Sequence, residues 1–248
     1  MDKKIFWIST AAVIISFFGG FLLANALNRS ELNTLRAETE RLKSASNASP
    51  NNNAELSLSD EEIRQKIAEA DKNPDNFNFQ KNLGLALYRY AAMKQDTLLL
   101  AEVVRLLTRA NQKDDKDYEV LIALGNSYFD IGYIKKDDEN LKKSREFYQK
   151  ALMQKPNDAD VRTDLGLTYF LVNPPETDKA LAEFNKSLQT NPKHEKTLQV
   201  MAQAFLSQNK TEEAEKYLTR LKEVNPKNQF LPELDLQISQ TKNGAPKQ

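Results

Sequence analysis

Few side chains of this chain could carry out catalysis, because its 248 residues include one histidine and no cysteine. Without cysteine, a disulfide, a zinc-thiolate site, an iron-sulfur cluster and a cysteine nucleophile are all excluded. His194 is the one candidate base for a hydrolytic triad, and it lies beside Pro192 in a turn, where a solvated loop histidine is the simpler interpretation. The seven glycines form no Gly-rich phosphate-binding loop. We therefore expect no enzyme activity and no cofactor.

Acidic residues gather at Asp114, Asp115, Asp117 and Glu119, which are oxygen ligands of the kind that calcium prefers. The segment lacks the glycine and the terminal glutamate of an EF-hand, so we expect no metal site there. The whole chain carries 35 basic and 35 acidic residues. This balance removes the long-range attraction to phosphate backbones, and we expect no nucleic-acid partner.

A long apolar segment lies near the start of the sequence, and the elements that could position a functional surface follow it. The 20 residues from Ile5 to Ala24 contain no ionisable side chain, and as a helix they would span roughly 30 Å, the thickness of a bilayer's hydrocarbon core. The sequence predicts a transmembrane signal anchor over residues 1–28, with the membrane contacted from Ile5 to Leu27. A cleaved signal peptide is the alternative, since residues 24–26 (Ala-Asn-Ala) resemble a cleavage site.

Two connecting segments follow the apolar one. Residues 29–43 carry Leu32, Leu35 and Leu42 at heptad spacing, which predicts a helical stalk. Two heptads are too few to hold a coiled coil alone, so a homodimer stays open. Residues 44–58 are rich in Ser and Asn without periodicity, which is typical of a flexible linker.

The remainder of the chain repeats one pattern four times. A small residue recurs within a helical pattern, and a large one follows three positions later on the same face. Glycine inside a helix costs about 1 kcal/mol against alanine, so its recurrence predicts a close helix crossing and a buried face. Proline ends three of the copies. The small residues are Gly84, Gly125, Gly166 and Ala202; the large ones are Leu87, Tyr128, Tyr169 and Phe205; the prolines are Pro156, Pro192 and Pro226.

This pattern resembles the tetratricopeptide repeat (TPR) from Asn76 to Pro226, although Gln80 and Arg162 stand where the fourth copy has Leu198. The resemblance implies an all-α fold, a right-handed solenoid of antiparallel helix pairs. About four repeats with flanking helices would lie behind the N-terminal transmembrane helix. A capping box at Ser59 and Glu62 predicts a first flanking helix, and residues 232–241 a last one. The TPR domain is thus expected over residues 59–241, with a disordered tail over residues 242–248.

In the family, the first helix of each pair lines a concave groove that binds a protein or a peptide. The resemblance therefore implies a groove of largely apolar and aromatic residues with a few amides. Alternatively, Tyr88, Phe129 and Phe170 pack against neighbouring helices. The implied groove residues are Lys81, Leu85 and Tyr88; Ile122, Asn126 and Phe129; Thr163, Leu167 and Phe170; and Gln199, Gln203 and Leu206.

The combination of one span, a stalk and repeats is similar to the accessory proteins that assemble envelope complexes, such as those of cytochrome c maturation. It implies a membrane-anchored scaffold or adaptor in the bacterial inner membrane, with its C-terminal domain in the periplasm. A self-associating structural protein and a secreted TPR module released by signal cleavage stay open as alternatives.

Overall fold

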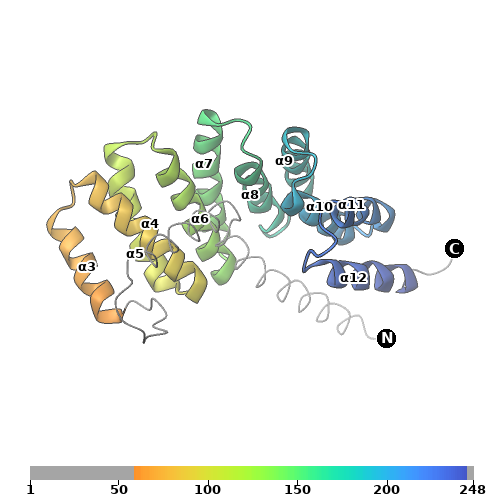
Figure 1. The fold of residues 1–248 in the computed structure, drawn as a ribbon, viewed down its shortest axis with the longest axis horizontal. Coiled ribbons are helices and arrows are strands. Elements are labelled where there is room, and N and C mark those ends of the chain that lie inside the picture. Colours follow the sequence, from red (N-terminus) through yellow and green to blue (C-terminus); the bar gives the residue numbers. More distant parts are fainter. Residues whose placement is uncertain (1–58, 245–248) are drawn as a thin grey trace, which may run out of the picture. The chain divides into compact units, whose positions relative to one another are not determined.

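The computed structural model describes residues 59–244, and this part contains ten α-helices and no strand (Figure 1). It divides into two units, one up to Lys113 and one from Asp114 onwards. The expected transmembrane anchor (1–28), stalk (29–43) and linker (44–58) lie outside the described residues, as do residues 245–248 of the expected tail. Among residues 59–244, no helix has both the length and the apolar character that a membrane crossing needs.

The first unit consists of α3 (Asp60–Lys72), α4 (Phe77–Lys94) and α5 (Thr97–Lys113), with α4 packed against both others. The predicted capping box starts α3: the Glu62 amide donates to Ser59 Oγ over 3.2 Å, and the Ser59 amide donates to the Glu62 carboxylate over 2.8 Å. These bonds satisfy two amides that a helix start leaves unpaired. The sequence prediction for this helix is confirmed.

Two departures from the repeat pattern serve the ends of preceding helices. Gln80 is fully buried, and its Nε2 donates to the carbonyls of Ala70 over 2.7 Å and Asn73 over 3.0 Å at the end of α3. In the second unit, Arg162 donates to the Pro156 carbonyl over 2.6 Å beyond the end of α7. Both polar side chains therefore donate to carbonyls at or just beyond the end of the preceding helix and tie it to the next first helix.

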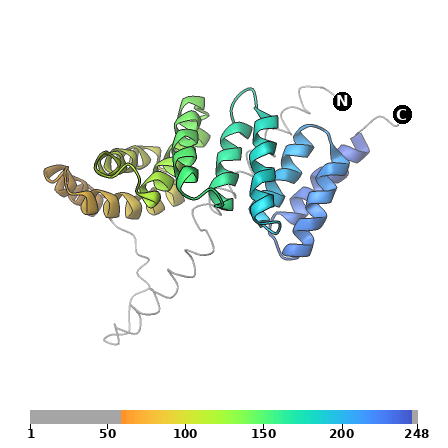
Figure 2. The same cartoon turned by 90° about the horizontal axis from the view of Figure 1, so that it is seen from above.

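The second unit contains seven helices, and each packs against the next (Figure 2). Helix α10 also contacts α8 and α12, so the helix pairs form successive layers. Helices α7, α9 and α11 each end two residues before one of the prolines, as predicted. The helices are α6 (Tyr118–Lys135), α7 (Asp138–Gln154), α8 (Ala159–Phe170), α9 (Thr177–Thr190), α10 (Glu195–Ser207), α11 (Thr211–Val224) and α12 (Leu231–Gly244).

The repeated glycines lie where paired helices cross. A Cβ atom added to Gly84 would lie 2.6 Å from Leu107 Cδ2, and one added to Gly125 would lie 2.6 Å from Tyr148 Cε1. Gly166 meets the Phe184 ring in the same way. Such distances leave no room for a side chain, so the predicted close crossing is confirmed in three pairs.

The paired helices of the first two copies are longer than the first helices of the last two. Helices α4 and α6 have 18 residues and α5 and α7 have 17, whereas α8 and α10 have 12 and 13. Between α6 and α7, Lys136 ends one helix in the left-handed conformation, with φ at 53°, and Asp137 caps the next. Lys136 and Asp137 therefore form a tight turn between the two helices.

Helix α12 is longer than the sequence predicted, because it continues to Gly244 and includes residues 242–244 of the expected tail. An ion pair between Lys242 and Glu215 of α11 holds this last turn.

Candidate partner-binding surfaces

In the first unit, α4 carries three of the predicted groove residues. Lys81 and Leu85 are half-buried, and Lys81 Nζ lies 6.0 Å from the centre of the Phe77 ring. Tyr88 is buried, with 8% of its surface exposed. Lys81 and Leu85 therefore retain surface that a partner could contact, whereas Tyr88 retains little.

Helix α6 carries the second set. Ile122 and Asn126 are half-buried, while Phe129 is 1% exposed and belongs to the core. Asn126 Oδ1 accepts a hydrogen bond of 2.7 Å from the Tyr148 hydroxyl of α7. Burial raises the pKa of Tyr148 well above its ordinary value, so the phenol stays protonated and keeps donating. Asn126 thus keeps its NH₂ group and one lone pair of Oδ1 for a ligand.

Helix α8 buries two of its three predicted groove residues. Thr163 and Leu167 have no exposed surface, and Phe170, at the end of the helix, is half-buried. Thr163 Oγ1 lies 2.6 Å from Thr197 Oγ1 of α10 and 3.0 Å from Ser187 Oγ of α9. These three hydroxyls, which we call the hydroxyl cluster, join three helices. The Thr163 hydroxyl therefore stabilises helix packing and does not face a partner.

His194 was predicted to be a solvated loop histidine, and this prediction is wrong. Its side chain instead extends the hydroxyl cluster. It precedes α10, where its Nδ1 lies 2.6 Å from Thr197 Oγ1 and its Nε2 lies 3.0 Å from Asp160 Oδ1 of α8. Acid, imidazole and hydroxyl follow one another as in a hydrolytic triad. Thr197 is fully buried, so its hydroxyl is closed to a substrate, and this arrangement fastens α10 to α8.

Helix α10 carries the fourth set. Gln199 is 3% exposed and Gln203 is 9% exposed, and Leu206 is half-buried. Gln199 Nε2 and Gln203 Oε1 are buried and form no hydrogen bond within the described residues. Half of the twelve predicted groove residues thus keep accessible surface. They are Lys81, Leu85, Ile122, Asn126, Phe170 and Leu206.

A buried ion pair also joins α8 to α10. The Asp164 carboxylate and the Lys196 ammonium of this pair lie within 2.5 Å, and their side chains are 8% and 18% exposed. Burial raises the pKa of Asp164, and the neighbouring ammonium opposes that shift. The sequence pattern did not indicate this pair, because its members lie 32 residues apart.

The large residues of the repeat pattern were expected to be buried, but this holds only for Leu87. Tyr128, Tyr169 and Phe205 are half-buried. The rings of Tyr128 and Phe147 stack at 5.7 Å and 8°, and those of Phe205 and Tyr217 stack at 5.5 Å and 16°. Flat side chains from the second helix therefore cover one face of Tyr128 and one face of Phe205.

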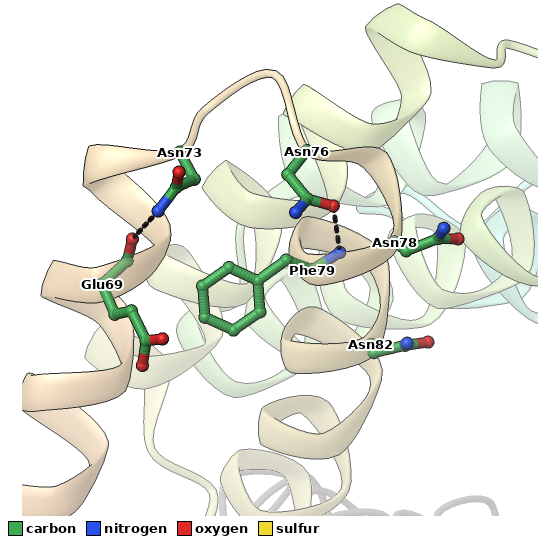
Figure 3. Close-up of a pocket in the computed structure, with 6 residues that line it drawn as sticks. All are labelled: Glu69, Asn73, Asn76, Asn78, Phe79 and Asn82. Atoms are coloured by element: carbon green, nitrogen blue, oxygen red, sulfur yellow. Dashed lines mark hydrogen bonds between the residues drawn. The ribbon is translucent and has the colours of Figure 1, made fainter.

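A pocket of about 420 Å³ lies on the first unit and is lined by Glu69, Asn73, Asn76, Asn78, Phe79 and Asn82 (Figure 3). Asn76 Oδ1 accepts from the Phe79 amide over 3.1 Å and caps α4, and Asn73 Nδ2 donates to the Glu69 carbonyl over 3.2 Å at the end of α3. Asn78 and Asn82 take no part in these caps. The sequence pattern did not predict this pocket, although residues 73–82 contain four asparagines.

The acidic residues considered for calcium serve the start of α6. Asp114 Oδ1 accepts from the Lys116 amide over 3.0 Å, and Asp117 Oδ1 accepts from the Val120 amide over 2.9 Å. Between Ser59 and Gly244, no group of three or more His, Cys, Asp or Glu side chains is placed to hold a metal ion.

Comparison with known proteins supports the repeats. Two family models described as tetratricopeptide repeat match residues 125–158 and 176–230. The crystal structure of MamA is similar with a TM-score of 0.53 and 21% identity, covering 67% of this chain and 88% of that chain. A thermophilic TPR protein of Thermus thermophilus has a TM-score of 0.53 and 16% identity, covering 73% and 97%. No curated protein matches the sequence. The chain therefore carries tetratricopeptide repeats, a fold that generally serves as a non-enzymatic scaffold for protein–protein interactions.

Proposed function

We propose that this chain is a membrane-anchored scaffold whose repeats hold a protein or peptide partner near the membrane surface. The tetratricopeptide repeats carry this proposal, because the fold generally mediates interactions between proteins. The proposed setting is the bacterial inner membrane, with the repeats in the periplasm, in the assembly of an envelope complex. The uncharged segment from Ile5 to Ala24 supports the anchor.

The accessible groove residues favour an apolar anchor on the partner. Phe170 and Leu206 are half-buried on α8 and α10, two first helices that contact each other. Aromatic and aliphatic side chains that lose their remaining exposed surface on binding dominate the energy of many interfaces. We expect these two residues to contribute most within the second unit.

Replacement of both anchors tests the groove. Phe170→Glu with Leu206→Glu should reduce recovery of a specific partner at least tenfold after crosslinking in intact membranes, while helicity and melting stay normal. Met153→Glu is the matched control, since Met153 is 76% exposed on α7. Phe129 is unsuitable because it is buried. Unchanged recovery would argue against the groove and in favour of the self-associating alternative.

The anchor is tested separately. The full chain should stay in the membrane fraction after alkaline extraction, and its repeats should be digested by protease added to spheroplasts. A mature protein that starts at Leu27 would instead establish the secreted alternative.

A further inference from the structure

We infer that the turn between α4 and α5 inserts into the surface of the lipid bilayer through the side chains of Met93 and Leu98. This inference rests on the proposed function, because the anchor must hold the first unit at a membrane. Met93 is 53% exposed and Leu98 is 79% exposed. Met93 is the last residue but one of α4 and Leu98 is the second residue of α5, so both flank one turn. We call residues 93–98 the apolar turn.

Leu98 departs from the residue type that the other repeats have at its position. The second residue of α7, α9 and α11 is exposed and acidic: Glu139, Asp178 and Glu212. An acidic side chain there is favourable, because it lies near the positive end of the helix dipole. Leu98 gains nothing from the dipole and leaves most of its apolar surface in water. One exposed leucine is ordinary, but two large apolar side chains at one turn indicate an interaction site.

The backbone of the apolar turn is held in place, so this exposure does not come from a frayed helix end. Gln95 ends α4 in the left-handed conformation, with φ at 53°. Asp96 Oδ1 then accepts from the amides of Leu98 and Leu99, each over 3.0 Å, at the start of α5. The fold therefore presents Met93 and Leu98 on a fixed support.

The charges next to the apolar turn favour an anionic lipid surface. Arg89 and Lys94 are exposed on α4, and Lys94 Nζ lies 5.8 Å from the centre of the Tyr90 ring. Asp96, which caps α5, is the one acidic residue among residues 81–101. Basic side chains attract anionic headgroups, and tyrosine suits the boundary between headgroups and acyl chains. The turn thus combines apolar, aromatic and basic side chains, as a contact with a membrane surface requires.

The tether favours lipid over a second protein as the occupant. Under the proposed function the anchor ends at residue 28, and the described chain begins at Ser59 in the first unit. A flexible chain of the intervening length has an average span of about 30 Å. The first unit is therefore held close to the bilayer, where a weak contact is sufficient. A stable protein interface usually buries about 800 Å² on each partner, far more than two side chains provide.

A fluorescent label tests the contact directly. The chain contains no cysteine, so the full-length variant Met93→Cys can carry a single environment-sensitive dye. It is reconstituted into vesicles of phosphatidylethanolamine and phosphatidylglycerol, with and without a spin-labelled lipid that quenches the dye at the membrane surface. We expect the quencher to remove at least half of the fluorescence. The control Met153→Cys, at a position of α7 that is 76% exposed, should lose little.

A second substitution tests the role of Leu98. Leu98→Glu, added to the labelled Met93→Cys chain, installs the residue type of the other repeats and should reduce the quenching at least threefold. Ala182→Glu, at an exposed position of α9, is the matched control and should leave the quenching unchanged. Leu98→Glu should melt no lower than its parent, since an acid in the first turn favours the helix, so a loss of quenching cannot be ascribed to misfolding.

The outcomes separate this inference from the proposed function. A labelled protein that stays in the vesicles after an alkaline wash, but is quenched equally at positions 93 and 153, would overturn the inference and leave the anchor intact. Protein released by the wash would overturn both. A dye whose emission changes with protein density but not with the spin-labelled lipid would show a protein contact at the turn, and would also overturn the inference.

Discussion

Within the second unit, the contact between α6 and α7 differs in chemistry from the contact between α8 and α10. The first joins two helices of one repeat, where Gly125 faces the Tyr148 ring and Tyr128 stacks on Phe147. The second joins two repeats through the hydroxyl cluster, His194 and the Asp164–Lys196 pair. Ring packing with one hydrogen bond, from Tyr148 to Asn126, thus joins α6 to α7, while a set of directed polar bonds joins α8 to α10 of the next repeat.

The largest loss of stability is expected from a substitution at the contact between α6 and α7. Gly125→Val would place side-chain atoms inside the Tyr148 ring and should lower the free energy of unfolding by about 3 kcal/mol. Chemical denaturation measures this change. Ala182→Val on the exposed side of α9 is the control and should stay within about 0.5 kcal/mol. Equal effects of both variants would contradict a tight crossing at Gly125.

The next prediction concerns the hydroxyl cluster. Thr163→Val keeps the side-chain shape but leaves the buried hydroxyls of Thr197 and Ser187 with one partner fewer. The free energy of unfolding should fall by about 2 kcal/mol, because two hydrogen bonds of Thr163 are lost and each contributes about 1 kcal/mol net. Thr219→Val, at an exposed position of α11, should change little. A stabilised Thr163 variant would mean that the polar link contributes specificity without stability.

The stacked rings should contribute less. Tyr128→Leu retains an apolar side chain but removes the stack on Phe147, for an expected loss of about 1 kcal/mol. A double-mutant cycle with Phe147→Leu isolates the coupling between the rings. If the losses of the two single variants add up to that of the double variant, the rings contribute to stability only through the apolar area that each buries.

The smallest net change at neutral pH is expected for the buried ion pair. Asp164→Asn with Lys196→Met replaces both charges, and such replacements are often near neutral, within about 1 kcal/mol. The folded pKa of Asp164 is raised, mainly by burial, so the folded state binds its proton more tightly than the unfolded state does. Its contribution to stability is therefore present below the ordinary pKa of an aspartate and is lost as the pH rises through the folded pKa.

Urea unfolding at a series of pH values measures this effect. The double variant should show a flatter decline of stability over that acidic window than the original chain does. Identical pH profiles would mean that Asp164 does not titrate differently in the folded state.

The sequence predicted what each repeat contains. Glycine positions, proline ends and the capping box at Ser59 follow from local backbone chemistry, which a single chain displays. The alternative that Tyr88 and Phe129 pack against neighbouring helices agrees with their burial, whereas the burial of Thr163 and Leu167 was not predicted, because it depends on contacts with residues distant in the sequence. His194 was misplaced for the same reason, since Asp160 lies 34 residues before it. The pocket that Glu69 and Phe79 line was not predicted either, because its residues come from two helices that only the fold brings together.

Gln80 also determines how the start of the described chain fluctuates. Its two bonds fasten the last turn of α3, while the first turn has the capping box and one buried side chain, Ile63. Local opening should therefore begin at Ser59 and spread towards Ala70, and amide hydrogen exchange along α3 should slow in that direction. Gln80→Leu would make the exchange rates of both ends of α3 nearly equal, with α4 still protected.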